Sequence, residues 1–158
     1  MAIMDSRVQF NTDGTPFDCD LENGATPVAL PNSIDLGVTG RDPGQGEPVY
    51  LNIVVTETFT DGGDAATLSL AVRSDSVEDV HVTTSTGHLV TPPMLKAALV
   101  AGNTFSYVLP QGSQGNTYER YLGVIATVAT AGFDAGQIEV WLGDDPVSNR
   151  KVYADATN

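Results

Sequence analysis

Positive charge is what this sequence has least of. Only 7 Lys and Arg residues stand against 20 Asp and Glu residues in a chain of 158, so the formal net charge is -13. The cations are scattered, apart from the pair Arg150 and Lys151. Nucleic acid and anionic membrane surfaces repel a chain of this charge unless its cations cluster. The composition therefore argues against nucleic acid and membranes as partners.

Cysteine and long apolar runs are scarce as well. Cys19 is the only cysteine, so no disulfide can form within the chain. The first ten residues, MAIMDSRVQF, lack the apolar stretch behind a basic start that marks a signal peptide. No window is long and apolar enough to span a bilayer. We therefore expect the protein to fold in the reducing cytoplasm, or in a particle assembled there.

The few residues with catalytic or metal-binding chemistry do not form a recognisable motif. His81 and His88 are the only histidines, and neither HExxH nor a cysteine pair accompanies them. A Ser–His–Asp triad stays open, although no G-x-S-x-G elbow supports one. Cys19 has no basic neighbour that would lower its pKa. We expect no catalytic, metal-binding or cofactor-binding residue, and hence no enzyme.

Two acidic loops could in principle hold a cation. Residues 18–22 (DCDLE) alternate like the opening of a calcium loop, but Asn23 and Ala29 occupy the positions where that loop needs glycine and a carboxylate. Asp61 and Asp64 flank two glycines, and Asp and Gly are also the ordinary residues of hairpin turns. A solvated loop and a turn are the simpler interpretations.

Alternating apolar residues are the strongest pattern that is present. Residues 49–59 (VYLNIVVTETF) and 66–73 (ATLSLAVR) each alternate, and a Gly-rich connector joins them, which predicts a β-hairpin. Further β-rich runs cover residues 33–36, 80–88, 104–109, 118–130 and 137–142, and residues 91–100 could form one or two helical turns. About eight short strands separated by turn signals predict an all-β fold, a jelly roll or β-sandwich.

The pattern also predicts how the chain is divided. Residues 1–32 lack sustained periodicity and are expected to form an irregular N-terminal arm, with one short strand near residues 6–10. Residues 33–143 are expected to form the β-domain, and residues 144–158 a projecting C-terminal tail. Trp141 and Tyr50 fall on outward strand faces, where they could anchor a partner or a sugar, or be covered by a second sheet or the arm.

Five segments, taken in order and spacing, resemble one family. They are SIDLG (33–37), RDPGQGEPVYLNIVV (41–55), ATLSLAVRSDS (66–76), ALVAGNTFSYVLP (98–110) and ERYLGVIATV (119–128). They are similar to the Bbp16-type capsid cement, or decoration, proteins of tailed bacteriophages. The resemblance implies a jelly-roll protein on the outside of an HK97-type head. There it would bridge major capsid subunits as a dimer or other small oligomer.

On this interpretation, irregular and weakly acidic parts of the chain would contact the capsid. The residues expected at that contact are Ile3, Met4, Arg7, Val8, Phe10, Arg41 and Asp42. Packaged DNA is a dense polyanion, so the net charge favours the outer surface of the shell over its lumen. Two other classes stay open: a carbohydrate- or receptor-binding β-module of a phage particle, and a cupin-like or hydrolytic enzyme.

Overall fold

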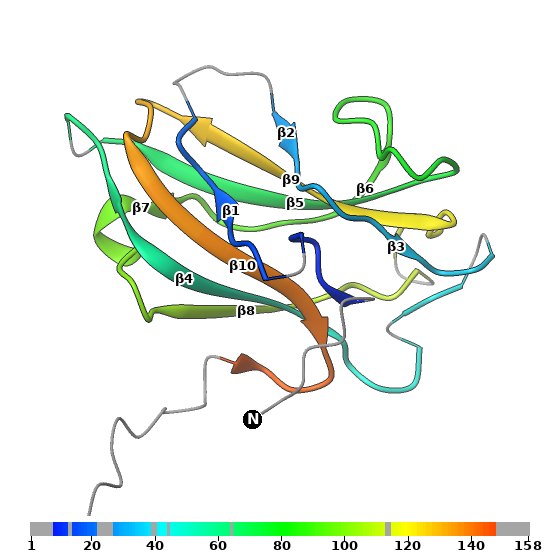
Figure 1. The fold of residues 1–158 in the computed structure, drawn as a ribbon. Helices are drawn as coiled ribbons and strands as arrows, with labels where there is room; N and C mark the ends of the chain where they lie inside the picture. The colour runs from blue at the N-terminus through cyan, green and yellow to red at the C-terminus, as the bar shows by residue number, and fades with distance from the viewer. Residues whose placement is uncertain are drawn as a thin grey trace, which may run out of the picture.

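Ten strands form two antiparallel sheets in the computed structural model, which describes residues 8–12, 14–21, 27–38, 41–43, 45–63, 65–112 and 115–147. Sheet A has the order β1 (Phe17–Asp18), β10 (Ala135–Gly143), β4 (Tyr50–Thr60) and β8 (Thr104–Val108). Sheet B has the order β2 (Val28–Ala29), β9 (Tyr121–Ala129), β5 (Thr67–Asp75) and β6 (Thr86–Val90), with β3 (Ile34–Asp35) on β9 and β7 (Met94–Leu95) on β5. Figure 1 shows the two layers.

The strand order is that of a jelly roll. Strands β2 and β3 both pair with β9, and β6 and β7 both pair with β5, so each couple is one interrupted strand. Counted this way, sheet A holds the first, eighth, third and sixth strands, and sheet B holds the second, seventh, fourth and fifth. The expected all-β class, with about eight strands in a sandwich, is thus confirmed.

The core lies between the two sheets. Strand β5 alternates buried and half-buried side chains along its whole length, because successive side chains of a strand point to opposite faces. The fully buried strand residues that meet in the middle are Leu51, Ile53 and Val55 from β4, Leu68, Leu70 and Val72 from β5, Leu122, Val124 and Ala126 from β9, and Ile138 and Val140 from β10. The predicted central position of the 118–130 run is confirmed, since β9 has partners on both sides.

The predicted hairpin of residues 49–59 and 66–73 is wrong. Strand β4 pairs with β10 and β8, whereas β5 pairs with β9, β6 and β7, so the connector crosses from one sheet to the other. Asp61 fixes this crossover: its buried carboxylate accepts the Ala66 N–H at 2.8 Å and lies 3.0 Å from Lys96 Nζ. Lys96 belongs to η2 (Lys96–Ala98), a single turn of 3-10 helix where one or two helical turns were expected.

The N-terminal segment also departs from expectation, because the described part of residues 1–32 is packed on the sandwich. The Phe10 side chain is fully buried, and the Phe10 N–H donates to Val140 O at 3.0 Å. Buried Asn11 continues the contact with β10: its Nδ2 donates to Ile138 O at 2.9 Å and its Oδ1 accepts the Val140 N–H at 2.7 Å. Asn11 therefore takes the place of a strand beside β10, although its neighbours have no alternating pattern.

This segment joins the two sheets at one side of the sandwich. Asn32, next to sheet B, donates its backbone N–H to Phe10 O at 3.0 Å and its side-chain Nδ2 to Asn11 O. Strands β1 and β2 come from the same segment and pair with β10 and β9. Residues 8–32, where described, are thus part of the β-domain and not an arm outside it.

Two smaller expectations also change. Residues 80–85 form a turn in place of the first part of the predicted 80–88 strand, and β6 begins only at Thr86. Arg73 holds this turn, because its guanidinium donates to Ser85 Oγ at 2.8 Å and to the Ser85 carbonyl. Only the part of the expected C-terminal tail up to Val147 is described, and it folds back. Buried Asn52 donates to Asp145 O at 3.0 Å and accepts the Val147 N–H at 3.1 Å.

Candidate interaction surface

The residues expected to contact a capsid are not gathered on one surface. Ile3, Met4 and Arg7 lie outside the described residues. Phe10 is fully buried and Val8 packs against the core, so these two side chains stabilise the sandwich. In this fold Phe10 cannot touch a partner, because every part of its side chain is already in contact with the protein.

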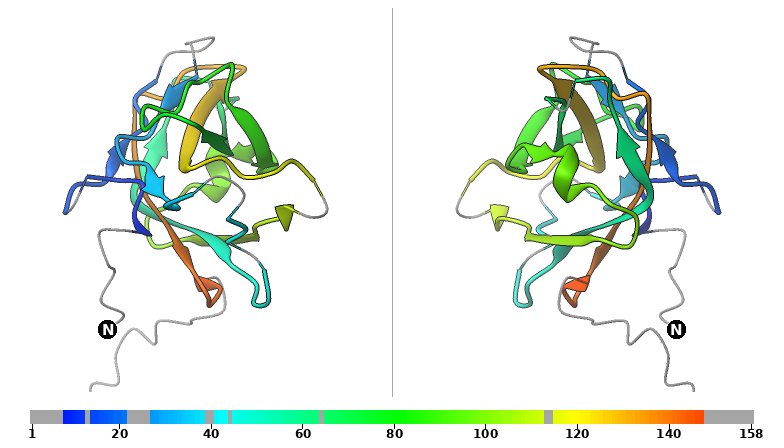
Figure 2. Two further views of the ribbon diagram at one scale, coloured as in Figure 1. Left: turned by 90° about the vertical axis from the view of Figure 1, so that its right-hand side faces the viewer. Right: turned by 90° about the vertical axis from the view of Figure 1, so that its left-hand side faces the viewer.

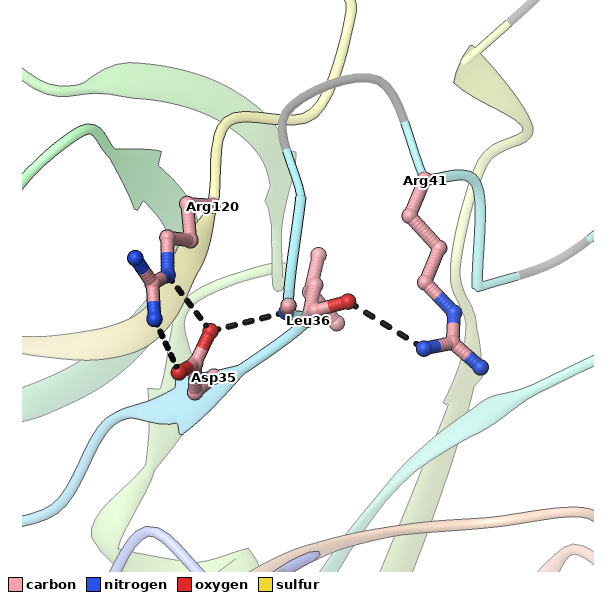
Figure 3. Close-up of polar contacts among 5 residues, drawn as sticks. Asp35, Leu36, Arg41 and Arg120 are labelled. Carbon is pink, nitrogen blue, oxygen red and sulfur yellow. Dashed lines mark hydrogen bonds and ion pairs between the residues drawn. The ribbon is translucent and has the colours of Figure 1, made fainter.

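Arg41 and Asp42 lie in the loop that follows β3, and the base of this loop is anchored by an ion pair. Arg120 and Asp35 form a bidentate ion pair. Nε of Arg120 lies 3.0 Å from Asp35 Oδ1, and Nη2 lies 2.9 Å from Asp35 Oδ2 (Figure 3). The hydrogen bond from Arg120, aided by the Gly37 N–H, lowers the pKa of Asp35 to about 2. Backbone pairing adds to the anchor, since the Leu36 N–H donates to Arg120 O at 2.8 Å.

Arg41 and Asp42 themselves have partners inside the protein. Arg41 donates from Nη1 to Leu36 O at 3.2 Å (Figure 3), and the residue is exposed. Asp42 is half-buried, and its Oδ2 accepts the Gly112 N–H at 2.8 Å. The Asp42 bond holds the loop against the β8–β9 connection, and the Arg41 bond joins the loop to its own start at Leu36. Their role at a capsid contact stays a prediction, but both side chains already act within the loop.

A buried polar network lies behind this loop. The ring of His88 stacks on Tyr118 with centroids 3.9 Å apart and an angle of 12° between the planes. His88 Nε2 lies 2.7 Å from Ser74 Oγ, which also accepts the Glu119 N–H at 2.9 Å. Tyr118 donates its hydroxyl to Pro110 O at 2.6 Å. The network thus joins β5, β6 and the two ends of the β8–β9 connection.

Burial dominates the electrostatics of this network. Desolvation, followed by the charge of Asp42, raises the pKa of Tyr118 to about 12. Burial is also the main cause that lowers the pKa of His88, although the charge of Glu119 acts in the opposite direction. Both groups therefore stay neutral near pH 7.

Ser74 and His88 are the nearest approach to a catalytic pair among the described residues. Ser74 is fully buried, and its oxygen already accepts a backbone hydrogen bond, so a substrate could not reach it in this conformation. His81 lies apart from His88 in sequence and role: its Nδ1 caps the 81–85 turn by accepting the Thr83 and Thr84 N–H groups. Burial, and secondarily Asp18, raises the pKa of Cys19. Within the described part of the chain, no group of three or more His, Cys, Asp or Glu residues could hold a metal ion.

Every cation of the described residues is engaged internally. Arg41 contacts a carbonyl, Arg73 holds the 81–85 turn, Lys96 pairs with Asp61, and Arg120 pairs with Asp35. The other three cations, Arg7, Arg150 and Lys151, lie outside the described residues. Carboxylates such as Glu57, Glu78 and Asp79 are exposed. The described surface therefore presents exposed carboxylates, whereas the described cations are already bonded within the protein.

The hollows on the surface are open. One groove of about 600 Å³ lies between residues 29–33 and residues 78–80, over Gly123 and Val124 of β9. A smaller hollow of about 120 Å³ is lined by Trp141, Asn52 and residues 143–147. Trp141 and Tyr50 are both half-buried, and Gln9 lies opposite Trp141. Trp141 is thus half-buried beside residues 143–147, which leaves less aromatic surface for a sugar.

The chain is similar to one protein family over most of its length. Residues 24–142 match the model of the Bbp16 family, and this stretch contains β2 to β9 and nearly all of β10. No curated protein matches the chain. In the part of the chain that the structure describes, no helix is long and apolar enough to cross a membrane.

Proposed function

The chain belongs to the Bbp16 family, and we propose on that basis that it is a cement, or decoration, protein of a tailed-phage head. In this role it binds the outer surface of an HK97-type shell and bridges neighbouring major capsid subunits. The observation that carries the proposal is the family match, because it spans the jelly roll from β2 to β10 and not a single motif.

The charge distribution supports the outer surface. A net charge of -13, with every described cation engaged inside the protein, leaves little to offset repulsion from packaged DNA. On the outside the same charge keeps the particle soluble. Neither nucleic acid nor a membrane is a partner in this proposal, and the role is structural, with no catalysis and no cofactor.

Because the described cations are bonded within the protein, the capsid surface that would bind this chain is a basic one. Basic groups bind exposed carboxylates, so the described surface would contact Lys and Arg side chains of the capsid subunits. Ile3, Met4 and Arg7 stay candidates for an additional contact, whereas Val8 and Phe10 are needed for the sandwich. Individual contacts can be weak, since many copies on a closed lattice raise the effective concentration of each.

The test adds purified protein to heads assembled without it and measures occupancy and resistance of the heads to heat. We expect saturable binding, a raised temperature of head disruption, and accessibility of the bound protein to an added protease. If basic capsid groups meet carboxylates, occupancy falls as salt is raised. Failure to bind heads, or protection of the protein inside intact heads, would refute the proposal.

A further inference from the structure

The groove of about 600 Å³ over β9 lies on the outer face of sheet B. On β9 the side chains at positions 122, 124 and 126 are buried in the core, so Gly123 faces outward. Residues 29–33 form one wall of the groove, and residues 78–80 form the other. Ligand-binding clefts usually measure roughly 300–1,000 Å³, so this hollow can hold a short segment of another chain. It is here called the β9 groove.

The first wall exists because the strand beside β9 is interrupted. Pairing of β2 with β9 ends at Ala29, and β3 resumes the pairing at Ile34. Residues 30–33 between them are more than the ladder can accommodate and bulge from the edge. Asn32 fixes the bulge, because its backbone N–H donates to Phe10 O at 3.0 Å. This wall is therefore formed before any partner binds.

The second wall is a loop that is fixed at both ends. Val80 is buried and packs on Gly123, where an added Cβ would lie only 3.0 Å from the Val80 side chain. Asp75 spans the loop: its Oδ1 accepts the N–H of the next residue at 2.7 Å, and its Oδ2 accepts the His81 N–H at 3.2 Å. A partner would therefore lose little free energy to ordering of this loop.

Glu78 and Asp79 are the charged residues of the β9 groove, and both are exposed. Neither forms a hydrogen bond or an ion pair with another described residue, whereas Asp35 is already paired with Arg120. Among the described residues that line the groove there is no Lys, Arg or aromatic residue. A cleft lined by charge of one sign concentrates the electric field and attracts ions of the opposite sign.

We propose that the β9 groove binds a short basic segment of a partner protein, with Lys or Arg side chains against Glu78 and Asp79. The two carboxylates repel an acidic segment, and the described lining offers no ring on which a sugar could stack. On a phage head the partner is the major capsid protein, and this assignment rests on the proposed function. The groove is then the place where carboxylates of this chain meet basic capsid groups.

Tetralysine tests the groove without any phage component. Its binding to the purified protein is followed by the shifts of backbone amide resonances in a nuclear magnetic resonance titration. We expect the largest shifts at residues 29–33 and 78–80, and weaker binding at higher salt, because salt screens exposed charges. The variant Glu78→Gln/Asp79→Asn keeps the size of both side chains. Loss of two exposed ion pairs should weaken its binding about five- to tenfold.

The matched control is Glu57→Gln/Asp144→Asn, which removes the same two charges from exposed positions on β4 and after β10. It should bind tetralysine almost as tightly as the wild type, because its substitutions lie outside the groove lining. Both variants are then added to heads assembled without the protein. There the groove variant should need a higher concentration for half occupancy than the wild type and the control.

The two arms of the experiment separate this inference from the proposed function. Tetralysine shifts spread evenly over the carboxylates of the surface, or equal weakening in the groove variant and the control, would overturn the inference. Heads that bind the wild type and the groove variant equally well would overturn it too. A wild-type chain that binds tetralysine in the groove but binds no heads would refute the proposed function and leave the groove a site for a basic segment.

Discussion

The outer faces of the two sheets are used in opposite ways. On sheet A, polar side chains at the outer face and along β10 hold the two ends of the described chain: Asn52 binds residues 145 and 147, and Asn11 binds β10. On sheet B, the residue 76–85 loop covers one half of the outer face, and the other half carries uncharged side chains such as Ser69, Ala71 and Thr127. Figure 2 shows the sandwich from two sides, each turned by 90° from the view of Figure 1.

This difference separates residues that stabilise the fold from residues that contribute little to stability. A buried side chain or a satisfied buried amide contributes to stability, because removing it leaves a cavity or an unpaired polar group. A half-exposed Thr, Ser or Val on a sheet face contributes little to stability. Substitutions of the buried residues on sheet A should therefore lower the free energy of unfolding, and substitutions at exposed positions of sheet B should leave it nearly unchanged.

Phe10→Ala should have the largest effect. The side chain is fully buried against sheet A, so its loss should lower the free energy of unfolding by about 3–5 kcal/mol. Denaturant-induced unfolding followed by tryptophan fluorescence measures this loss. Val38→Ala is the control, because Val38 is 63% exposed and its truncation should cost less than about 0.5 kcal/mol. Equal behaviour of the two variants would mean that the N-terminal segment does not support the sandwich.

The contribution of Phe10 also shows what the sequence could not predict. Strand positions were predictable because apolar and polar residues alternate, as in residues 49–59 and 66–73. Alternation indicates which side of a strand is buried, but it does not indicate which strand lies beside it. The partners of β4 and β5 were therefore predicted wrongly. Phe10 is a single buried residue in a segment without period, and no local pattern distinguishes it from an exposed aromatic residue.

The charged residues of the candidate surface were misjudged for a related reason. A lone Arg in a glycine-rich loop predicts an accessible cation, and Arg41 is exposed, yet its guanidinium bonds to Leu36 O five residues earlier. Asp61 lies in a turn as its neighbours predicted, but its buried pairing with Lys96 depends on the crossover between sheets. The outer face of sheet B likewise required the register, because β5 and β9 lie side by side although they are far apart in the sequence.

Asn52→Ala should have the next largest effect. The side chain makes three hydrogen bonds, to Asp145 O, the Val147 N–H and the Ser106 hydroxyl, and its loss should cost about 1–3 kcal/mol. Hydrogen exchange should locate the change, with faster exchange of the Val147 amide than in the wild type. Ser106→Ala removes only one of these bonds and should leave Val147 protected. Unchanged exchange at Val147 in Asn52→Ala would show that the side chain does not hold the C-terminal segment.

His88→Gln tests the polar network that closes the loop side of the sandwich, and its effect depends on pH. Burial lowers the pKa of folded His88 below the ordinary value of 6.5, so the unfolded chain takes up the proton first as pH falls. The stabilising contribution is complete above pH 6.5 and is lost as pH falls through the lowered pKa. Thermal unfolding between roughly pH 7 and pH 5 should show a decline in the wild type that is shallower in His88→Gln.

Asp35 serves as the internal reference for that experiment. Its folded pKa of about 2 lies below its ordinary value of 3.8, so its contribution is complete above pH 3.8 and is lost as pH falls through 2. Asp35→Asn should therefore keep the decline between pH 7 and 5 and change only the more acidic part of the curve. If stability falls with pH equally steeply in the wild type and in His88→Gln above pH 5, His88 is excluded as the titrating group.

The smallest effect is expected from two exposed valines on opposite sheets. Val90 lies at the edge of sheet B and is 66% exposed, whereas Val108 lies at the edge of sheet A and is 53% exposed. Valine and threonine have nearly the same shape and both suit strands, so Val90→Thr and Val108→Thr should each change stability by less than about 0.5 kcal/mol. Thermal unfolding of the two variants beside the wild type measures these changes. A loss above about 1 kcal/mol in either variant would show that its valine is packed against the protein and that this edge of its sheet contributes to the core.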